Sequence, residues 1–404
     1  MKRRLLAAIL LALGLAPVSS ESSLEARPSL RPVGASTRRS PAATKPETSG
    51  PKSPAPYDGP PAPNVAIEVT LDVEAAQGLL DLLSQPAFDL ERARSLETLP
   101  AIEAAIRESQ RGADVWEKDL ASAWDEKARP TLFDFHRIRD DRSRWSALLA
   151  TIAGRRADLT RIASERARAL MPSDRAISVR EPILFTFGLP GRADHVAIGS
   201  PDGASWSVVA DVARELSDEP SAAPEEQVKH LSRMMAGEAF RLAWATYRTG
   251  SPAWQKHDAS LGTLEPLLRK VAEAGPIALY AVDENFFPLA VWLRQPMRDS
   301  IDELNRYADR IAAAGGDLDA RMEVAAEIQK PEFTGNLAGP SGSFLADGIF
   351  EFLGVGGYRA ALAGGPRAFF EAYDRAAQKK AGALVPLSKA IRQQLAAGAS
   401  PKKG

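Results

Sequence analysis

Residues Glu225 to Thr249 read EEQVKHLSRMMAGEAFRLAWATYRT, and this stretch predicts a long helix with two apolar faces. At about 100° per residue its apolar side chains fall into two stripes on opposite sides. One stripe holds Leu231, Met234, Met235, Leu242 and Ala245, and the other holds Ala236, Phe240, Trp244 and Tyr247. A helix of this kind is covered on both faces. We therefore expect the rest of the fold to pack around it.

Glu238 interrupts the first apolar stripe. A carboxylate among Leu and Met side chains needs a cation, a hydrogen-bond donor or a proton, because an isolated buried charge is costly. Arg241 follows three residues later, which makes the two side chains neighbours on the helix surface. We expect an ion pair between them. The alternative is a polar gap in which Glu238 binds water.

The composition is that of an ordinary globular protein. The chain has 404 residues, of which 45% are hydrophobic and 25% charged. A formal net charge of −1 gives no basic field for nucleic acid. Cysteine is absent, which excludes thiol nucleophiles, thiolate zinc sites and an acylated cysteine. Only oxygen and imidazole ligands remain for a metal.

The N-terminus reads as a secretory signal followed by a linker. Residues 1–20 combine a basic start at Lys2, Arg3 and Arg4 with the short apolar run LLAAILLALGLA. That run is too short to span a bilayer comfortably, so we expect cleavage before Glu21 and export to the periplasm or the medium, with no transmembrane segment left. Residues 21–64 contain ten prolines and are predicted to be a disordered linker.

The remainder, residues 65–395, is predicted to form one α+β domain that is predominantly α. Residues 65–176 indicate a short strand and then a helical array. Residues 177–395 indicate a small central sheet followed by a helical half. The sheet is predicted from the runs ISVREPILFTFG, HVAIG and WSVVADV, with hairpin-like connections at Gly188–Gly191 and Pro201–Gly203. A loop is expected at FTGNLAGPSGSF, and residues 396–404 form a loose tail.

Four motifs occur in a suggestive order along this domain. They are FGLPGRADHVAIG, then GEAFR, then VAEAGPIALYAVD, then DGIFEFLGVGGYRAALAGGPRAFFEAYDRA. Each is loose, but their order over roughly residues 65–377 resembles a family of bacterial zinc-dependent peptidases of the gluzincin type. The resemblance implies a zincin-like helical half. It places Glu238 at the general-base position of an H-E-x-x-H helix, with Gly237 and Arg241 at the positions of the two zinc-binding histidines.

The departures from that pattern concern the metal. Gly237 offers no side chain, and Arg241 brings a positive charge where a ligand is needed. At the third-ligand stretch, Ala274 stands in the expected place and Glu273 is displaced by one residue. Zinc takes three protein ligands and a water in a catalytic site. We therefore expect no bound cofactor, an inactive Glu238, and a non-catalytic protein that binds a peptide or protein in the former cleft.

Two other hypotheses stay open at this point. An active metallohydrolase would hold zinc through rearranged ligands, for which the candidates are His230, His257, Glu265 and Glu273. A structural envelope protein would have no cleft function at all. The remaining histidines, His136 and His195, are interpreted as packing or surface residues.

Overall fold

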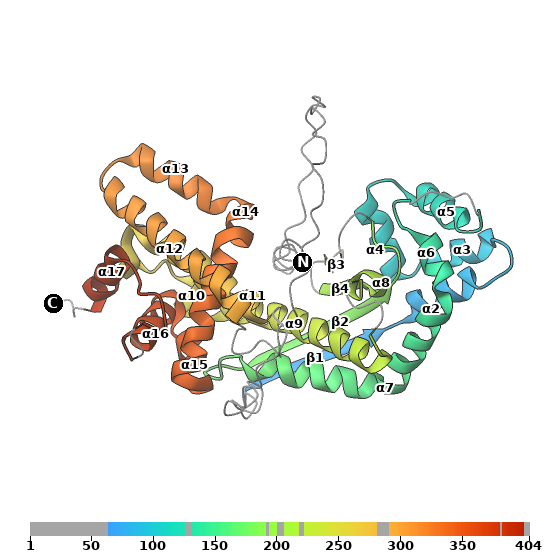
Figure 1. Cartoon of the computed structure of the whole chain (residues 1–404), viewed down its shortest axis with the longest axis horizontal. Helices are drawn as coiled ribbons and strands as arrows, with labels where there is room; N and C mark the ends of the chain where they lie inside the picture. The colour runs from blue at the N-terminus through green and yellow to red at the C-terminus, as the bar shows by residue number, and fades with distance from the viewer. Residues whose placement is uncertain are drawn as a thin grey trace, which may run out of the picture.

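The structure is a computed structural model, shown in Figure 1. It describes residues 64–125, 131–190, 194–199, 206–217, 222–280, 291–379 and 382–399. The predicted signal segment 1–20 and nearly all of the predicted linker 21–64 lie outside the described residues. The buried apolar side chains form a continuous core that runs from Val65 to Leu395.

A helical array follows the first strand, as the sequence predicts. Its members are α2 (Glu74–Leu83), α3 (Leu90–Glu97), α4 (Pro100–Ser109), α5 (Ala113–Ser122), α6 (Phe135–Asp140) and α7 (Arg142–Ala169). The boundaries follow local chemistry. Asp89 caps α3 by accepting a hydrogen bond from the backbone N–H of Arg92, and Pro100 occupies the first turn of α4, where no N–H is needed.

The central sheet has four strands in the order β1-β2-β4-β3. They are β1 (Val65–Asp72), β2 (Ile177–Thr186), β3 (His195–Gly199) and β4 (Trp206–Asp211). β1, β2 and β4 are parallel, and β3 is antiparallel to β4 at the edge. Of the two predicted hairpins, only the second matches the pairing, because β3 pairs with β4 across residues 200–205. The first is wrong: β2 pairs with β4, so the connection predicted at Gly188–Gly191 does not join strands that are neighbours in the sheet.

The C-terminal half is helical, and α9 (Pro224–Gly250) connects it to the sheet (Figure 1). The other helices are α8 (Val212–Glu215), α10 (Pro252–Gln255), η1 (Ala259–Leu264), α11 (Glu265–Tyr280), α12 (Val291–Ala314), α13 (Leu318–Gln329), α14 (Pro331–Phe333), η3 (Thr334–Ala338), α15 (Gly339–Ala363), α16 (Gly365–Lys379) and α17 (Lys389–Ala399). The fold is thus α+β and predominantly α, as predicted. α17 continues past residue 396, where the tail was expected to begin.

The loop expected at FTGNLAGPSGSF is instead helical, in η3 and the start of α15. Within it, Gly342 serves packing rather than a turn. A Cβ placed on Gly275 of α11 would lie 2.6 Å from the Cα of Gly342 in α15, so the two backbones touch. Only glycine at both positions permits that approach. Glycine and proline therefore misled the prediction here.

α9 is covered on both faces, as its two stripes predict. It packs against β2 and α7 on the sheet side and against α11 in the C-terminal half. Leu231 and Met235 are fully buried on the first stripe, as are Phe240 and Trp244 on the second. Across the described ranges, no helix is both long enough and apolar enough for a bilayer crossing.

Candidate functional site

The ion pair expected in the middle of α9 is present. Glu238 is 6% exposed. Arg241 approaches one of its oxygens, Oε2, from two nitrogens, with Nε at 2.8 Å and Nη2 at 2.7 Å. Charge-assisted contacts of this length are among the stronger polar interactions in proteins. The buried carboxylate is therefore compensated by the cation one turn further along the same helix.

His195 supplies a second cation to Glu238 from a distant part of the chain. It is the first residue of β3, opposite Ala210 of β4. Its Nε2 lies 3.4 Å from Oε1 of Glu238, and its Nδ1 lies 2.7 Å from Oε1 of Glu215 in α8. The imidazole thus bridges two carboxylates. His230, two turns before Glu238 in α9, has its Nε2 3.9 Å from the other oxygen of Glu215.

These contacts fix the charges of the cluster. Burial lowers the pKa of His195, but its hydrogen bonds to Glu215 and Glu238 outweigh burial and raise that pKa well above 6.5. Burial raises the pKa of Glu215, but His195 and His230 bring it down to about 2. Burial likewise opposes ionisation of Glu238, whose pKa is lowered below 4.5 by His195 and Arg241. Near neutral pH, negative and positive groups therefore alternate from Glu215 through His195 and Glu238 to Arg241.

Glu181 adds a carboxyl group whose pKa is raised rather than lowered. It lies in β2, is 1% exposed, and its Oε2 has no hydrogen-bond partner among the described residues. Burial raises its pKa to about 8, with a further increase from the negative charge of Glu238 and a partial offset from Arg241. It is therefore neutral at about pH 7. Two carboxyl groups in one cluster thus hold opposite protonation states.

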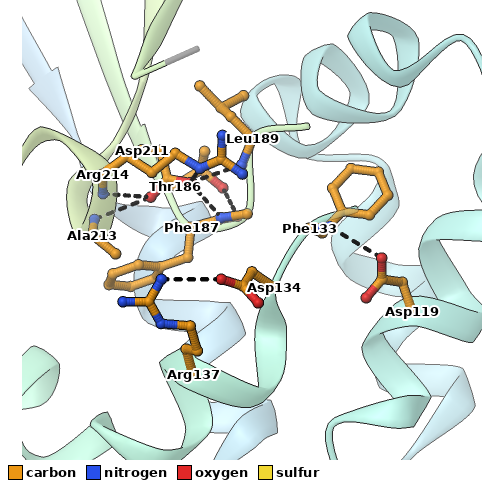
Figure 2. Close-up of polar contacts among 11 residues, drawn as sticks. Asp119, Phe133, Asp134, Arg137, Thr186, Phe187, Leu189, Asp211, Ala213 and Arg214 are labelled. Atoms are coloured by element: carbon orange, nitrogen blue, oxygen red, sulfur yellow. Dashed lines mark hydrogen bonds and ion pairs between the residues drawn. The ribbon is translucent and has the colours of Figure 1, made fainter. Parts of the chain in front are cut away.

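Asp211 positions the start of α8, the helix that ends at Glu215; its contacts with Ala213, Arg214 and Leu189 are shown in Figure 2. It ends β4 and is 1% exposed. Its Oδ1 accepts hydrogen bonds from the backbone N–H groups of Ala213 at 3.0 Å and Arg214 at 3.3 Å, which caps α8. Its Oδ2 accepts from the N–H groups of Gly188 and Leu189, both at 2.9 Å, which anchors the turn after β2. One side chain therefore ties α8 to the ends of two neighbouring strands.

The outer edge of β3 lies next to this cluster. The backbone N–H of Asp211 donates to the carbonyl of Asp194 at 2.8 Å. In an antiparallel ladder, alternate residues face the partner strand, so Asp194, Val196 and Ile198 point their backbone groups at β4. His195, Ala197 and Gly199 then turn their N–H and C=O groups outward. In the described part of the chain, no strand pairs with that outer edge.

The metal candidates from the sequence do not meet at one point. Glu273 pairs with Arg248 at 3.1 Å. His257 contacts Glu265 at 3.2 Å, and Arg269 also binds that carboxylate. Within the described ranges, no three or more His, Asp or Glu side chains are arranged to hold a metal ion.

The H-E-x-x-H positions themselves do not fit zinc. A Cβ built on Gly237 would have the ring of Tyr280 as its nearest contact, at 4.0 Å, and Gly237 supplies no ligand atom. Arg241 places a guanidinium against Glu238, and a cation cannot act as a ligand to another cation. The third-ligand region places Pro276 and Ala274 in the core. The residues present therefore favour an ion-pair cluster over a metal centre.

Comparison with protein-family models, curated proteins and solved structures found no match. The likeness to gluzincin peptidases therefore stays a prediction that rests on the order of the four motifs. Sequence reasoning singled out Glu238 and Arg241, and it missed Glu181, His195 and Glu215. Glu181 did carry a signal, because it occupies an inward position of the strand between Ile177 and Ile183.

Proposed function

We propose that this protein is an exported, non-catalytic relative of zinc peptidases that binds an extended peptide along the outer edge of β3. The observation that carries the proposal is the double compensation of Glu238 by Arg241 and His195. A general base works best with a pKa near the working pH. Glu238 instead has a lowered pKa and both of its oxygens in contact with cations.

The place of Arg241 in the helix motif also supports a protein that has lost its zinc site. In the H-E-x-x-H pattern it stands where the second histidine would hold zinc. A guanidinium there supplies a positive charge next to the carboxylate without any metal. The ion pair also keeps α9 stable, because a buried carboxylate without a partner is costly.

The edge of β3 supports peptide binding. The outward N–H and C=O groups of His195 and Ala197 can pair with an extended chain in the way that edge strands accept an added strand. The side chain of His195 joins that edge to the charged cluster beneath it. A structural envelope protein without a cleft function would not bind peptides there.

Amide hydrogen exchange, read residue by residue, tests the peptide-binding half of the proposal. The probe is a tryptic digest of unfolded casein, which supplies many extended peptides. We expect slower exchange at the amides of His195 and Ala197 when peptides are added. The amides of Val196 and Ile198 should not change, because they already bond to β4. Unaltered exchange at Ala197 with saturating peptide would refute the proposed binding site.

The same mixture tests the non-catalytic half. After prolonged incubation, mass spectrometry should recover the casein peptides uncleaved. New termini that increase with protein concentration would contradict it.

Ile67 of β1 provides a matched control for the exchange experiment, since it lies at the opposite edge of the sheet and should not respond to peptide.

A further inference from the structure

The cluster beneath β3 exposes its cations and buries its carboxylates. The side chains of Arg241 and His230 are 30% and 33% exposed, and that of His195 is 17% exposed. Those of Glu238 and Glu215 are only 8% and 9% exposed. A molecule that approaches the cluster from solvent therefore meets the basic side chains of Arg241 and the two histidines first.

Arg241 keeps hydrogen-bond donors for a ligand after it has bound Glu238. A guanidinium carries five N–H donors in a planar fork. Its contacts with Glu238 use Nε and one side of Nη2. The other donors are directed away from that carboxylate. Gly237, four residues earlier in α9, has no side chain, and a Cβ built there would meet only the ring of Tyr280 within 4.0 Å.

The net charge of the cluster also permits an anionic ligand. Glu215 and Glu238 are balanced by His195 and Arg241. Burial keeps Glu181 neutral near pH 7, so it adds no negative charge beneath Arg241. Nearby, Arg214 pairs with Asp211 at 3.3 Å, and a further acidic neighbour is Asp194. Burial and Glu215 raise the pKa of Asp194 to about 6, so this carboxylate is mostly ionised at pH 7, where it faces the positive charges of His195 and Arg214.

We propose that the β3 site selects peptides through a carboxylate, which binds Arg241 with His195 and His230 beside it. The carboxylate is either an Asp or Glu side chain or the C-terminal group of the peptide. This inference rests on the proposed peptide-binding function and names the class of peptide. Arg and carboxylate groups suit each other because their planar forks match.

Three matched peptides test the inference by fluorescence anisotropy. The first has one central Glu and an amidated C-terminus, the second has Gln in place of that Glu, and the third is the Gln peptide with a free C-terminal carboxylate. We expect one of the two carboxylate peptides to bind roughly tenfold more tightly than the neutral peptide, as a charged hydrogen bond predicts. The one that binds more tightly identifies the source of the carboxylate.

Variants then assign the preference to the cluster. His230→Gln, at a side chain that is one-third exposed, should reduce the preference several-fold and leave the fold intact. Arg241→Lys keeps a positive charge next to Glu238 but loses the fork, and it should abolish most of the preference. Arg161→Gln is the matched control on the surface of α7, where Arg161 pairs with Glu165 at 3.0 Å, and it should change nothing.

Two negative results are distinguishable. Equal affinity for all three peptides, together with slowed exchange at the amide of Ala197, would overturn carboxylate selection and leave the proposed function standing. If no peptide slows exchange at Ala197, the proposed function fails and the inference fails with it. A preference that survives Arg241→Lys and His230→Gln unchanged would also overturn the inference.

Discussion

Replacing Arg241 by Met should destabilise the protein strongly, because it leaves Glu238 ionised inside the fold. Removing one partner of a buried ion pair typically costs about 3–5 kcal/mol. Two features reduce that cost here. His195 stays 3.4 Å from the carboxylate, and the Arg241 side chain is 30% exposed, so water already screens part of the pair. We therefore expect a loss of about 2–3 kcal/mol near neutral pH.

The loss should depend on pH in a direction that the pKa of Glu238 fixes. In the folded protein that pKa lies below its ordinary value of 4.5. The pair therefore stabilises the fold above about pH 4.5, and this contribution fades as the pH falls through the lowered folded value. The effect of Arg241→Met should be largest near neutral pH and should shrink in acid, where Glu238 takes up a proton.

A double-mutant cycle measures the coupling. Chemical unfolding of the wild type, Arg241→Met, Glu238→Gln and the double variant gives the four free energies of unfolding. The double variant should recover about 1–2 kcal/mol of the loss caused by Arg241→Met, since it leaves no unpaired charge. The surface pair Arg161–Asp158, at 3.4 Å with the same spacing along α7, is the matched control and should couple by less than about 1 kcal/mol. Strictly additive effects of Arg241→Met and Glu238→Gln would refute the reasoning.

Three further predictions concern Glu181, His195 and the glycine contact between α11 and α15. Because the pKa of Glu181 is raised to about 8, the wild type should lose stability as the pH rises from 4.5 through 8. Glu181→Gln should remove this pH dependence and raise the free energy of unfolding by about 3 kcal/mol at pH 7. A pH profile of urea unfolding that is the same as that of the wild type would contradict this prediction. His195→Gln should lower the melting temperature at neutral pH, because Glu215 and Glu238 lose their shared cation; an unaltered melt would contradict the bridge. Gly342→Ala should reduce the free energy of unfolding by about 1–3 kcal/mol, because its new Cβ would press on the backbone of α11. Gly154→Ala is the control: its Cβ meets open space, so the same melts should show no change or a gain of up to about 1 kcal/mol.

Local rules explain what the sequence predicted correctly. The length of α9, its coverage on both faces and the Glu238–Arg241 pair all follow from helical spacing within one segment. The strands were recognisable from their composition. Their order was not, because β1 reaches β2 over more than a hundred residues and β2 bypasses β3 to pair with β4.

The contact of His195 with Glu238 could not be inferred from the sequence either, because it also depends on the order of the strands. His195 belongs to a short strand at the sheet edge, and only the order β1-β2-β4-β3 brings it over α9. The sequence indicates His230 as a metal-ligand candidate, yet in the structure it contacts Glu215, which carries no recognisable signal in the sequence. Side chains that meet through tertiary pairing leave no periodic signal in a single sequence.

The content of tightly held zinc tests the central claim most directly, namely that Arg241 supplies the positive charge that a metal supplies in the H-E-x-x-H pattern. The purified protein is equilibrated with excess zinc, dialysed against zinc-free buffer and measured by elemental analysis. The Glu238–Arg241 and Glu238–His195 contacts predict no stoichiometric zinc. Retention of about one zinc ion per chain would contradict the account, because a zinc site needs ligand positions that these ion pairs occupy.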